Sequence, residues 1–244
     1  RQRQMCIRDR ASIECLIDET TRLLSEQDFA GRKVVVTAGP TREPIDAIRF
    51  ISNPSSGKMG YALAARAWQR GAEVKLISGP TALAAPTGVE FIQVGTAQEM
   101  YDACQEAAGE ADVFIGAAAV GDFAPEAVRA DKLPREASLE LKLAPTKDGL
   151  ATIGQRSKGR PSLVVGFAAE TEKLEENAKR KCRDKGIDLI VANEVNQLGR
   201  GFGSDFNEVV LVYADGRVES LPRQPKDELA DEILNAAKQL LDNR

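Results

Sequence analysis

The sequence contains no histidine among its 244 residues. This absence excludes Ser-His-Asp chemistry, histidine general bases and histidine-ligated metals. Any catalysis must therefore use lysine, arginine, carboxylate, asparagine or backbone amide groups, with the help of a hard cation. These groups suit phosphate and acyl-phosphate chemistry, in which stabilising charge matters more than shuttling protons.

Other features are scarce as well. The four cysteines, at positions 6, 15, 104 and 182, form no C-x-x-C pair, which is typical of free thiols in a reducing cytoplasm. No apolar run reaches the length of a bilayer span, and no secretory signal opens the chain. The net charge of −4 argues against a general nucleic-acid binder. We therefore expect a cytoplasmic protein with neither a membrane nor a nucleic acid as partner.

What is present is an alternation of apolar, β-branched runs with helical patterns, which predicts an α/β fold with a mostly parallel sheet and helices on both faces. The predicted strands are Lys33–Thr37, Val74–Ser78, Glu90–Val94, Asp112–Gly116, Leu163–Phe167 and Asp188–Ala192. The predicted helices are Gly57–Arg70, Ala97–Ala108, Gly149–Lys158, Glu172–Lys185 and Lys226–Leu241.

Two later segments break this alternation. Leu139–Leu143 alternates strictly and predicts a half-exposed strand, and residues 208–221 predict a hairpin around Asp215-Gly216. Residues 1–30 are interpreted as a tail and linker helix, with helical spacing over Ile13–Leu24. The first ten are basic and aperiodic, either a sequence artefact or a remnant of a domain junction. Residues 31–244 form the predicted main domain.

The segment Ser52–Gly60 is polar, contains Gly57 and Gly60, and leads directly into an alanine-rich helix. Unpaired amides at a helix start favour negative charge, so the segment is a candidate phosphate site. It matches neither a P-loop nor a complete G-x-G-x-x-G fingerprint. Ordinary helix capping is the alternative.

Five ordered motifs resemble the phosphopantothenate–cysteine ligase family of coenzyme A biosynthesis, in particular the bacterial CTP-using ligase half of a bifunctional decarboxylase/ligase. They are Thr37–Pro44, Arg49–Gly60, Ala118–Phe123, Gly166–Thr171 and Asp188–Asn193. The resemblance covers about residues 31–241. It implies a Rossmann-like core with a smaller β element used for dimerisation, a homodimer, and fusion to or association with a flavin-dependent decarboxylase.

The implied reaction joins 4′-phosphopantothenate to L-cysteine with CTP and Mg²⁺. The carboxylate attacks the α-phosphate of CTP and releases pyrophosphate, and the cysteine amine then displaces CMP from the acyl-cytidylate. By resemblance, Asn53 stabilises this intermediate and Lys132 is needed for turnover and contacts the nucleotide. As alternatives, an asparagine before proline is often a turn residue and a lone loop lysine is often solvated.

The resemblance also implies a set of nucleotide-binding residues. They are Gly57, Lys58, Gly60, Ala118, Asp122, Lys132, Asp148, Phe167, Lys181 and Lys185. Asp122 is the candidate reader of the cytosine amino group or the ribose, with a turn or capping role as the alternative. Lys147 and Gly149 replace the family's usual proline and aliphatic residue around Asp148. No metal ligand is assigned.

Two other functions are alternatives to the ligase. An NAD(P)-dependent reductase would need a dinucleotide fingerprint after Val36 and an acid at the end of the second strand, and both are missing. A nucleotide-binding module without chemistry is the third reading. The ordered presence of Asn53, Asp122 and Lys132 argues against it.

Overall fold

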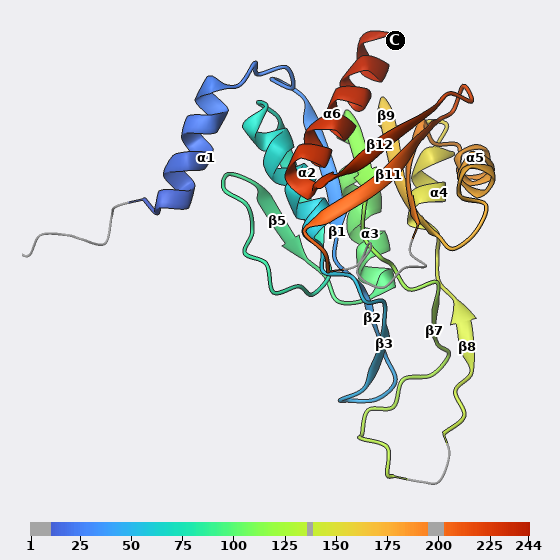
Figure 1. Cartoon of the computed structure of the whole chain (residues 1–244). Helices are drawn as coiled ribbons and strands as arrows, with labels where there is room; N and C mark the ends of the chain where they lie inside the picture. Colours follow the sequence, from blue (N-terminus) through green and yellow to red (C-terminus); the bar gives the residue numbers. More distant parts are fainter. Residues whose placement is uncertain (1–10, 136–138, 195–202) are drawn as a thin grey trace, which may run out of the picture.

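An eight-stranded sheet forms the centre of the computed structural model, which describes residues 11–135, 139–194 and 203–244 (Figure 1). The strand order is β12-β11-β10-β9-β6-β1-β4-β5. The parallel strands are β1 (Lys33–Ala38), β4 (Glu73–Ser78), β5 (Glu90–Gln93), β6 (Val113–Gly116), β9 (Leu163–Glu170) and β10 (Leu189–Glu194). The antiparallel edge strands are β11 (Phe206–Tyr213) and β12 (Val218–Pro225).

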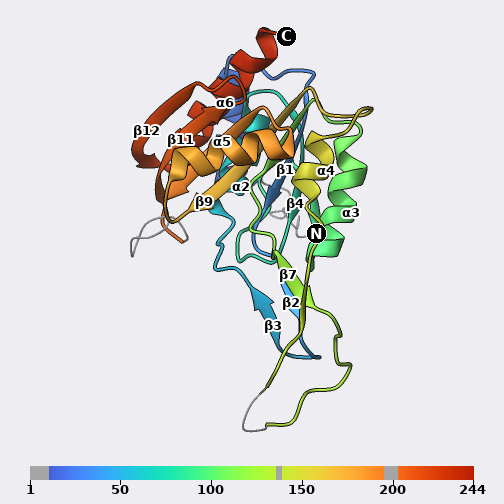
Figure 2. The same cartoon turned by 90° about the vertical axis from the view of Figure 1, so that its right-hand side faces the viewer.

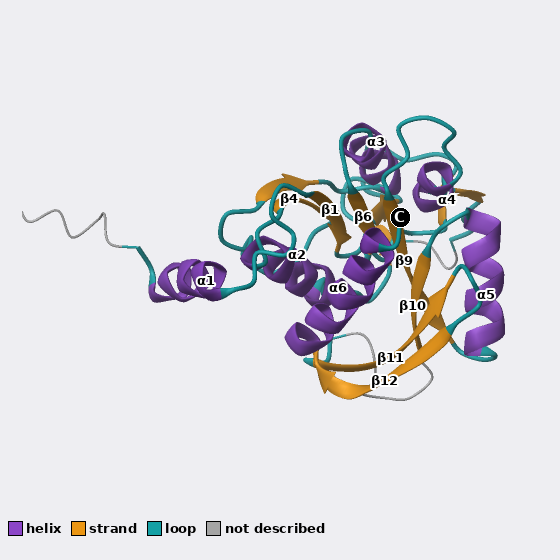
Figure 3. Ribbon diagram, turned by 90° about the horizontal axis from the view of Figure 1, so that it is seen from above, coloured by secondary structure: helices purple, strands orange, loops and turns teal. Residues whose placement is uncertain are grey.

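Helices cover both faces of this sheet (Figure 3). Helices α2 (Lys58–Gln69) and α6 (Lys226–Asp242) pack on one face, and α3 (Ala97–Ala108), α4 (Gly149–Gly154) and α5 (Leu174–Lys185) pack on the other. Because both faces are covered, the central strands are apolar along their whole length, as in the fully buried run Val34–Ala38. The predicted fold class is confirmed.

The strand order places a topological switch point at β1. From β1 the chain goes outward to β4 and β5, and then returns to pair β6 with the other side of β1. The helices that follow β1 and β6, α2 and α4, therefore lie on opposite faces of the sheet, and a crevice opens at the carboxyl ends of these two strands. Ligands of open α/β sheets bind in such crevices.

Two small antiparallel pairs extend below that edge of the sheet (Figures 1 and 2). Strand β2 (Arg42–Pro44) pairs with β3 (Phe50–Ser52), and β7 (Phe123–Pro125) pairs with β8 (Leu143–Pro145). The sequence patterns did not predict β2, β3 or β7, because strands of three residues are too short to show a period. The pairs β2–β3 and β7–β8 are thus small β elements outside the main sheet. They are built mostly from residues other than 139–143 and 208–221, which the sequence patterns indicated.

Two details of the sequence-based expectations were wrong. Leu139–Leu143 is not the predicted strand: among the described residues Phe123–Pro125 pairs with Leu143–Pro145, so the strand begins only at Leu143. The helix expected over 149–158 ends at Gly154, where the chain passes close to the backbone of Lys185. The hairpin around Asp215-Gly216 is confirmed, but it extends the main sheet and is no separate element.

The N-terminal helix α1 (Ile13–Leu24) forms where it was predicted and lies at the side of the domain (Figure 1). Its polar side contacts the end of α2: Asp18 accepts from Gln69 at 2.9 Å, and Arg22 donates to the carbonyl of Trp68. Its apolar residues, such as Ile13 and Leu24, are exposed. Residues 1–10 lie outside the described part of the chain.

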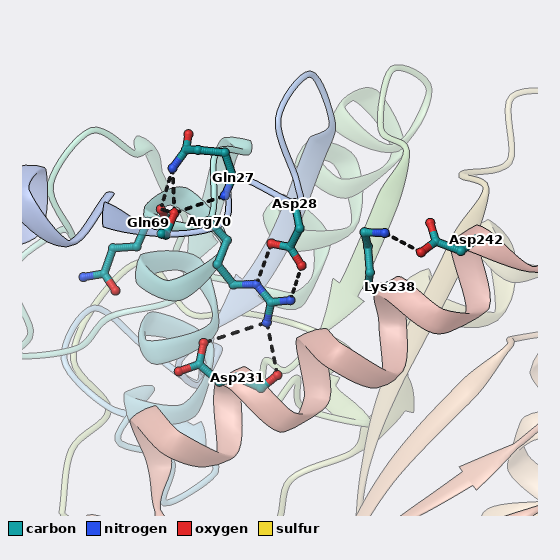
Figure 4. A network of polar contacts seen from close by, with 8 residues as sticks. Gln27, Asp28, Gln69, Arg70, Asp231, Lys238 and Asp242 are labelled. Carbon is teal, nitrogen blue, oxygen red and sulfur yellow. Dashed lines mark hydrogen bonds and ion pairs between the residues drawn. The ribbon is translucent and has the colours of Figure 1, made fainter. Parts of the chain in front are cut away.

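An arginine at the end of α2 joins three segments of the domain (Figure 4). The Arg70 guanidinium binds both carboxylate oxygens of Asp28, at 3.0 and 2.5 Å, and donates to the carbonyl of Asp231 on α6. The Arg70 and Asp28 side chains are only 14% and 19% exposed. Through these contacts Arg70 holds the end of α2 against α6 and against the loop before β1. The N-terminus of the same helix α2 lies at the site described below.

Candidate functional site

The loops after β1 and β6 are joined by backbone and threonine hydrogen bonds. The amide of Ala119 donates to the carbonyl of Gly39 at 2.9 Å, and the amide of Gly121 donates to Thr41 Oγ1 at 2.9 Å. Thr41 is fully buried. The floor of the crevice is therefore rigid backbone, held by small residues that leave room for a flat ligand.

Asn53 lies at the rim of this floor. Its Nδ2 contacts the carbonyl oxygens of Ala119 and Val120, at 3.2 and 3.1 Å. An amide nitrogen carries two hydrogens, and these two carbonyls use both. To donate to a ligand oxygen, Asn53 must give up one of them. The side chain is thus fixed beside the crevice but is not yet directed at a ligand.

A cavity of about 420 Å³ opens between the two loops and helices α3, α4 and α5. This volume is in the usual range for a small-molecule site, about 300–1,000 Å³. Six of the predicted nucleotide-binding residues line this cavity: Ala118, Asp122, Asp148, Phe167, Lys181 and Lys185. Segments separated by more than sixty residues in the sequence therefore meet at one place.

Sequence reasoning missed several residues of this cavity. Met100, Tyr101 and Cys104 of α3 are examples, whereas Lys147 belongs to the loop around Asp148 that the resemblance pointed to; its ammonium lies 4.9 Å from the Tyr101 ring centroid. Leu150 fits over the sheet because Gly116 and Gly166 carry no side chain there: a Cβ on Gly166 would lie 2.7 Å from Leu150 Cδ2. Nothing in the local sequence indicates these contacts, since each joins different elements.

The two predicted lysines of α5 are paired with carboxylates, of which Asp148 lines the cavity and Glu170 does not. Lys181 Nζ lies 2.7 Å from Glu170 Oε1, and Lys185 Nζ lies 2.9 Å from Asp148 Oδ2. Asp148 also caps α4 by accepting from the amide of Ala151. The i,i+4 spacing of Lys181 and Lys185 places both ammonium groups on the same face of α5. Both are held at the cavity and can turn to an anionic ligand.

A second cavity, of about 130 Å³, adjoins the first and shares Ala118, Ala119 and Phe167 with it. It lies at the N-terminus of α2, and the predicted residues Gly57, Lys58 and Gly60 line it. Gly57 has φ +77°, and no side chain caps the helix. The first amides of α2 are therefore left for solvent or for an anion.

Gly60 has a different role from the one suggested by its place in the motif. A Cβ there would lie 2.6 Å from Ala38 Cβ and 2.8 Å from the carbonyl oxygen of Thr37. The missing side chain thus lets α2 pack on β1, as the last glycine of a dinucleotide fingerprint does. The inserted β2–β3 pair separates this part of the fingerprint from Gly39, which explains why the sequence pattern looked incomplete.

Lys132 is not brought to either cavity. It is exposed, in the segment between β7 and β8. Its neighbour Leu133 is bound to the turn between β2 and β3: the amide of Leu133 donates to Asp46 Oδ2 at 3.0 Å, and Arg49 donates to the carbonyl of Leu133. The catalytic assignment of Lys132 stays a prediction.

Two negative findings concern the described residues alone. Across residues 11–135, 139–194 and 203–244, no three acidic or cysteine side chains cluster in a way that could hold a metal ion. In the same ranges no helix combines the length and the apolar character needed to cross a bilayer.

The strand order and the crevice at the switch point define a doubly wound α/β domain with a cavity of small-molecule size. A family model described as the DNA/pantothenate metabolism flavoprotein C-terminal domain matches residues 29–241. The chain belongs to this family.

Relatives with known names agree. The chain is 43% identical over 214 residues to the coenzyme A biosynthesis bifunctional protein CoaBC of Vibrio parahaemolyticus, and the match covers 86% of this chain and 53% of that protein. The corresponding protein of Bacillus subtilis is 44% identical over 221 residues, with 86% and 54% covered. The chain thus spans about half the length of these relatives.

Solved structures show which half it resembles. The crystal structure of the C-terminal domain of a CoaBC protein superposes with a TM-score of 0.77 at 40% identity, covering 90% of this chain and 100% of that one. A DNA/pantothenate metabolism flavoprotein from Streptococcus pneumoniae has a TM-score of 0.73 at 21% identity, covering 86% and 99%, which supports the fold alone.

Proposed function

We propose that the chain is a CTP-dependent phosphopantothenate–cysteine ligase. The observation that supports this most is the pair of adjoining cavities with a common wall of Ala118, Ala119 and Phe167. A nucleoside fits the larger one, and the phosphates extend over the shared wall toward the uncapped N-terminus of α2. The relatives named CoaBC and the motifs of the sequence support the same activity.

In this arrangement each residue has a physical role. Phe167 packs on the base, and the Asp122 carboxylate accepts a hydrogen bond from the cytosine amino group. Lys181 and Lys185 exchange their carboxylate partners for the nucleotide. Asn53 gives up a backbone carbonyl to donate to the acyl-cytidylate, where charge develops as each leaving group departs.

Among the described residues, no carboxylate lines the smaller cavity, where the phosphates would lie. Mg²⁺ would therefore be held mainly by the triphosphate and by water, a mode that is common for this ion and needs no all-protein cage. When bound, the ion would neutralise charge on the triphosphate. A homodimer, and fusion to or association with a flavin-dependent decarboxylase, belong to the same proposal.

The test is a pyrophosphate-release assay with CTP, Mg²⁺, 4′-phosphopantothenate and cysteine. We expect pyrophosphate and CMP with CTP, and pyrophosphate with little CMP when cysteine is omitted. Pyrophosphate release with ATP but not CTP would show that the nucleotide is wrong. Nucleotide binding without any release would favour a binding module.

Two variants address the predicted catalytic residues. Asn53→Asp should lower turnover and leave CTP affinity nearly unchanged, because the carboxylate repels the acyl-cytidylate without touching the nucleotide cavities. Lys132→Gln should lower turnover without changing the thermal midpoint, since the side chain is exposed. Wild-type rates for Lys132→Gln would exclude this lysine from catalysis.

A further inference from the structure

A buried carboxylate lies directly behind the wall of the larger cavity. Glu170 is the last residue of β9, and its side chain is 11% exposed. Because side chains alternate between the two faces of a strand, Glu170 lies on the α5 face together with Ala168, while Phe167 lies on the other face. Glu170 does not line the cavity. Any effect that it has on a bound ligand must therefore act through a neighbouring side chain.

Two side chains of α5 hold this carboxylate. Lys181 Nζ lies 2.7 Å from Glu170 Oε1, and Asn177 Nδ2 donates to Glu170 Oε2 at 3.2 Å. Asn177 also donates to the carbonyl of Glu172 at 3.0 Å, so both of its amide hydrogens are in use. The amide thus fixes one oxygen of the carboxylate. Glu170 stays behind when the Lys181 side chain turns toward a ligand.

The two lysine–carboxylate pairs at the cavity differ in burial. Glu170 Oε1 is buried and, among the described residues, receives no hydrogen bond of good geometry, so the Lys181 charge compensates for its burial. The Asp148 side chain is 48% exposed, and water can replace Lys185 there at little cost. A buried carboxylate that loses its charged partner is strongly disfavoured. Releasing Lys181 to a ligand therefore costs more than releasing Lys185.

This cost opposes the binding of an anion by Lys181. The lysine lines the larger cavity, and its side chain is 36% exposed. The contact with a phosphate and the contact with Glu170 that it replaces are both charge-assisted and similar in strength. Lys181 consequently adds little net affinity while Glu170 carries its charge. A glutamine at this position would keep the shape of the side chain and remove the competing charge.

We propose that Glu170 is a positioning residue that competes with the nucleotide phosphates for Lys181 and thereby limits their affinity. The inference rests on the proposed function and adds a residue to which that function assigned no role of its own. Glu170 holds the ammonium at the cavity wall before the ligand binds and takes it back when the phosphates leave. Replacing a residue that only supports the fold would weaken binding. Replacing Glu170 by glutamine should strengthen it.

The experiment is calorimetric titration of the full chain with CTP, inorganic tripolyphosphate and cytidine, in the presence of Mg²⁺. Glu170→Gln should bind CTP and tripolyphosphate about tenfold more tightly, because Lys181 then gains a charge-assisted contact without giving one up. Cytidine carries no phosphate, so its affinity should stay unchanged. If circular dichroism shows that Glu170→Gln is unfolded, Glu170→Met serves as the neutral variant.

A double variant tests whether the gain depends on Lys181. Glu170→Gln/Lys181→Met removes both charges together, so neither is left buried without its partner. It should bind CTP about tenfold more weakly than Glu170→Gln, and no more tightly than the wild type.

Glu176→Gln is the matched control, because it removes the same charge from α5 at a side chain that is 76% exposed. Water and salt screen that position, so CTP affinity should change by less than about twofold.

Four results would overturn the inference: unchanged or weaker CTP binding by Glu170→Gln, an equal gain in Glu176→Gln, a gain that persists in the double variant, or no binding of either phosphate compound by the wild type. Tripolyphosphate separates this inference from the ligase assignment. Tighter tripolyphosphate binding by Glu170→Gln, in a protein that releases no pyrophosphate from CTP, would retain the competition and reject the ligase. Pyrophosphate release from CTP, with unchanged affinities in Glu170→Gln, would do the reverse.

Discussion

Replacing Gly60 by alanine would put a methyl group into the contact between α2 and β1. The new Cβ would lie 2.6 Å from Ala38 Cβ and 2.8 Å from the carbonyl oxygen of Thr37. Carbon atoms in contact prefer about 3.5–4.0 Å, so α2 must move by about 1 Å at its N-terminal turn. Neither partner can yield easily, because one is backbone and the other is a methyl group on a buried central strand.

The magnitude follows from two opposing effects. Overpacking of a tight contact costs about 1–3 kcal/mol, while alanine is favoured over glycine within a helix by up to about 1 kcal/mol. We expect Gly60→Ala to lower the free energy of unfolding by about 1–2 kcal/mol, measured by urea denaturation. The displaced amides of α2 should also raise the KM for CTP severalfold.

Gly109→Ala is the control for this prediction. Gly109 ends α3 in right-handed helical conformation, φ −64°, and the nearest atom to a new Cβ is 3.6 Å away. Its stability and KM should equal those of the wild type or show a small gain in stability. A Gly60→Ala protein as stable as the wild type, with an unchanged KM, would refute the close-packing role of Gly60.

Two further predictions concern Arg70 and the buried thiols. Arg70→Met should cost about 1–3 kcal/mol of unfolding free energy, because it leaves the half-buried Asp28 carboxylate without its charged partner. The hydrogen bonds from Arg70 lower the pKa of Asp28, so the pair's contribution is present at neutral pH and is lost as the pH falls below the ordinary value of 3.8; an equally steep acid limb in the variant would contradict this. Burial raises the pKa of Cys104 to about 12 and that of Cys182 to about 11. Alkylation at pH 8, followed by peptide mass spectrometry, should therefore modify the half-buried Cys15 before Cys104 and Cys182. Rapid labelling of Cys104 in the folded protein would show that its cavity wall opens.

The fold class was readable from the sequence because burial on both faces of a parallel sheet forces long apolar strands. Runs such as Lys33–Thr37 and Leu163–Phe167 carry that signal locally. The limits of β2 and β7 could not be read in the same way, because three-residue strands exist only through their partners. Leu139–Leu143 alternates like a strand, yet within the part of the chain that the structure describes no strand pairs with residues 139–142.

In the candidate site, too, some residues could be found from the sequence and others only from the structure. Asn53, Gly57 and Asp122 stand in the motifs that carry the family resemblance, and the same resemblance also indicated Lys181 and Lys185. All five lie at or beside one of the two adjoining cavities or their rim. Their assigned roles in binding and catalysis stay predictions.

Other parts of the site have no local signature. Tyr101, Leu150 and Lys226 reach the cavities from different helices. Lys132 was selected by motif but lies on the segment between β7 and β8, away from both cavities.

By itself, the sequence determined the chemistry available to this protein: no histidine, lysines and carboxylates at spaced positions, and a polar glycine segment before a helix. It also determined the layered sheet, because periodic burial is a local property of the chain. Only the tertiary structure decided that Gly60 serves helix packing and that Lys226 lines the cavity at the N-terminus of α2. Both facts depend on contacts between segments distant in the chain, which no local pattern encodes.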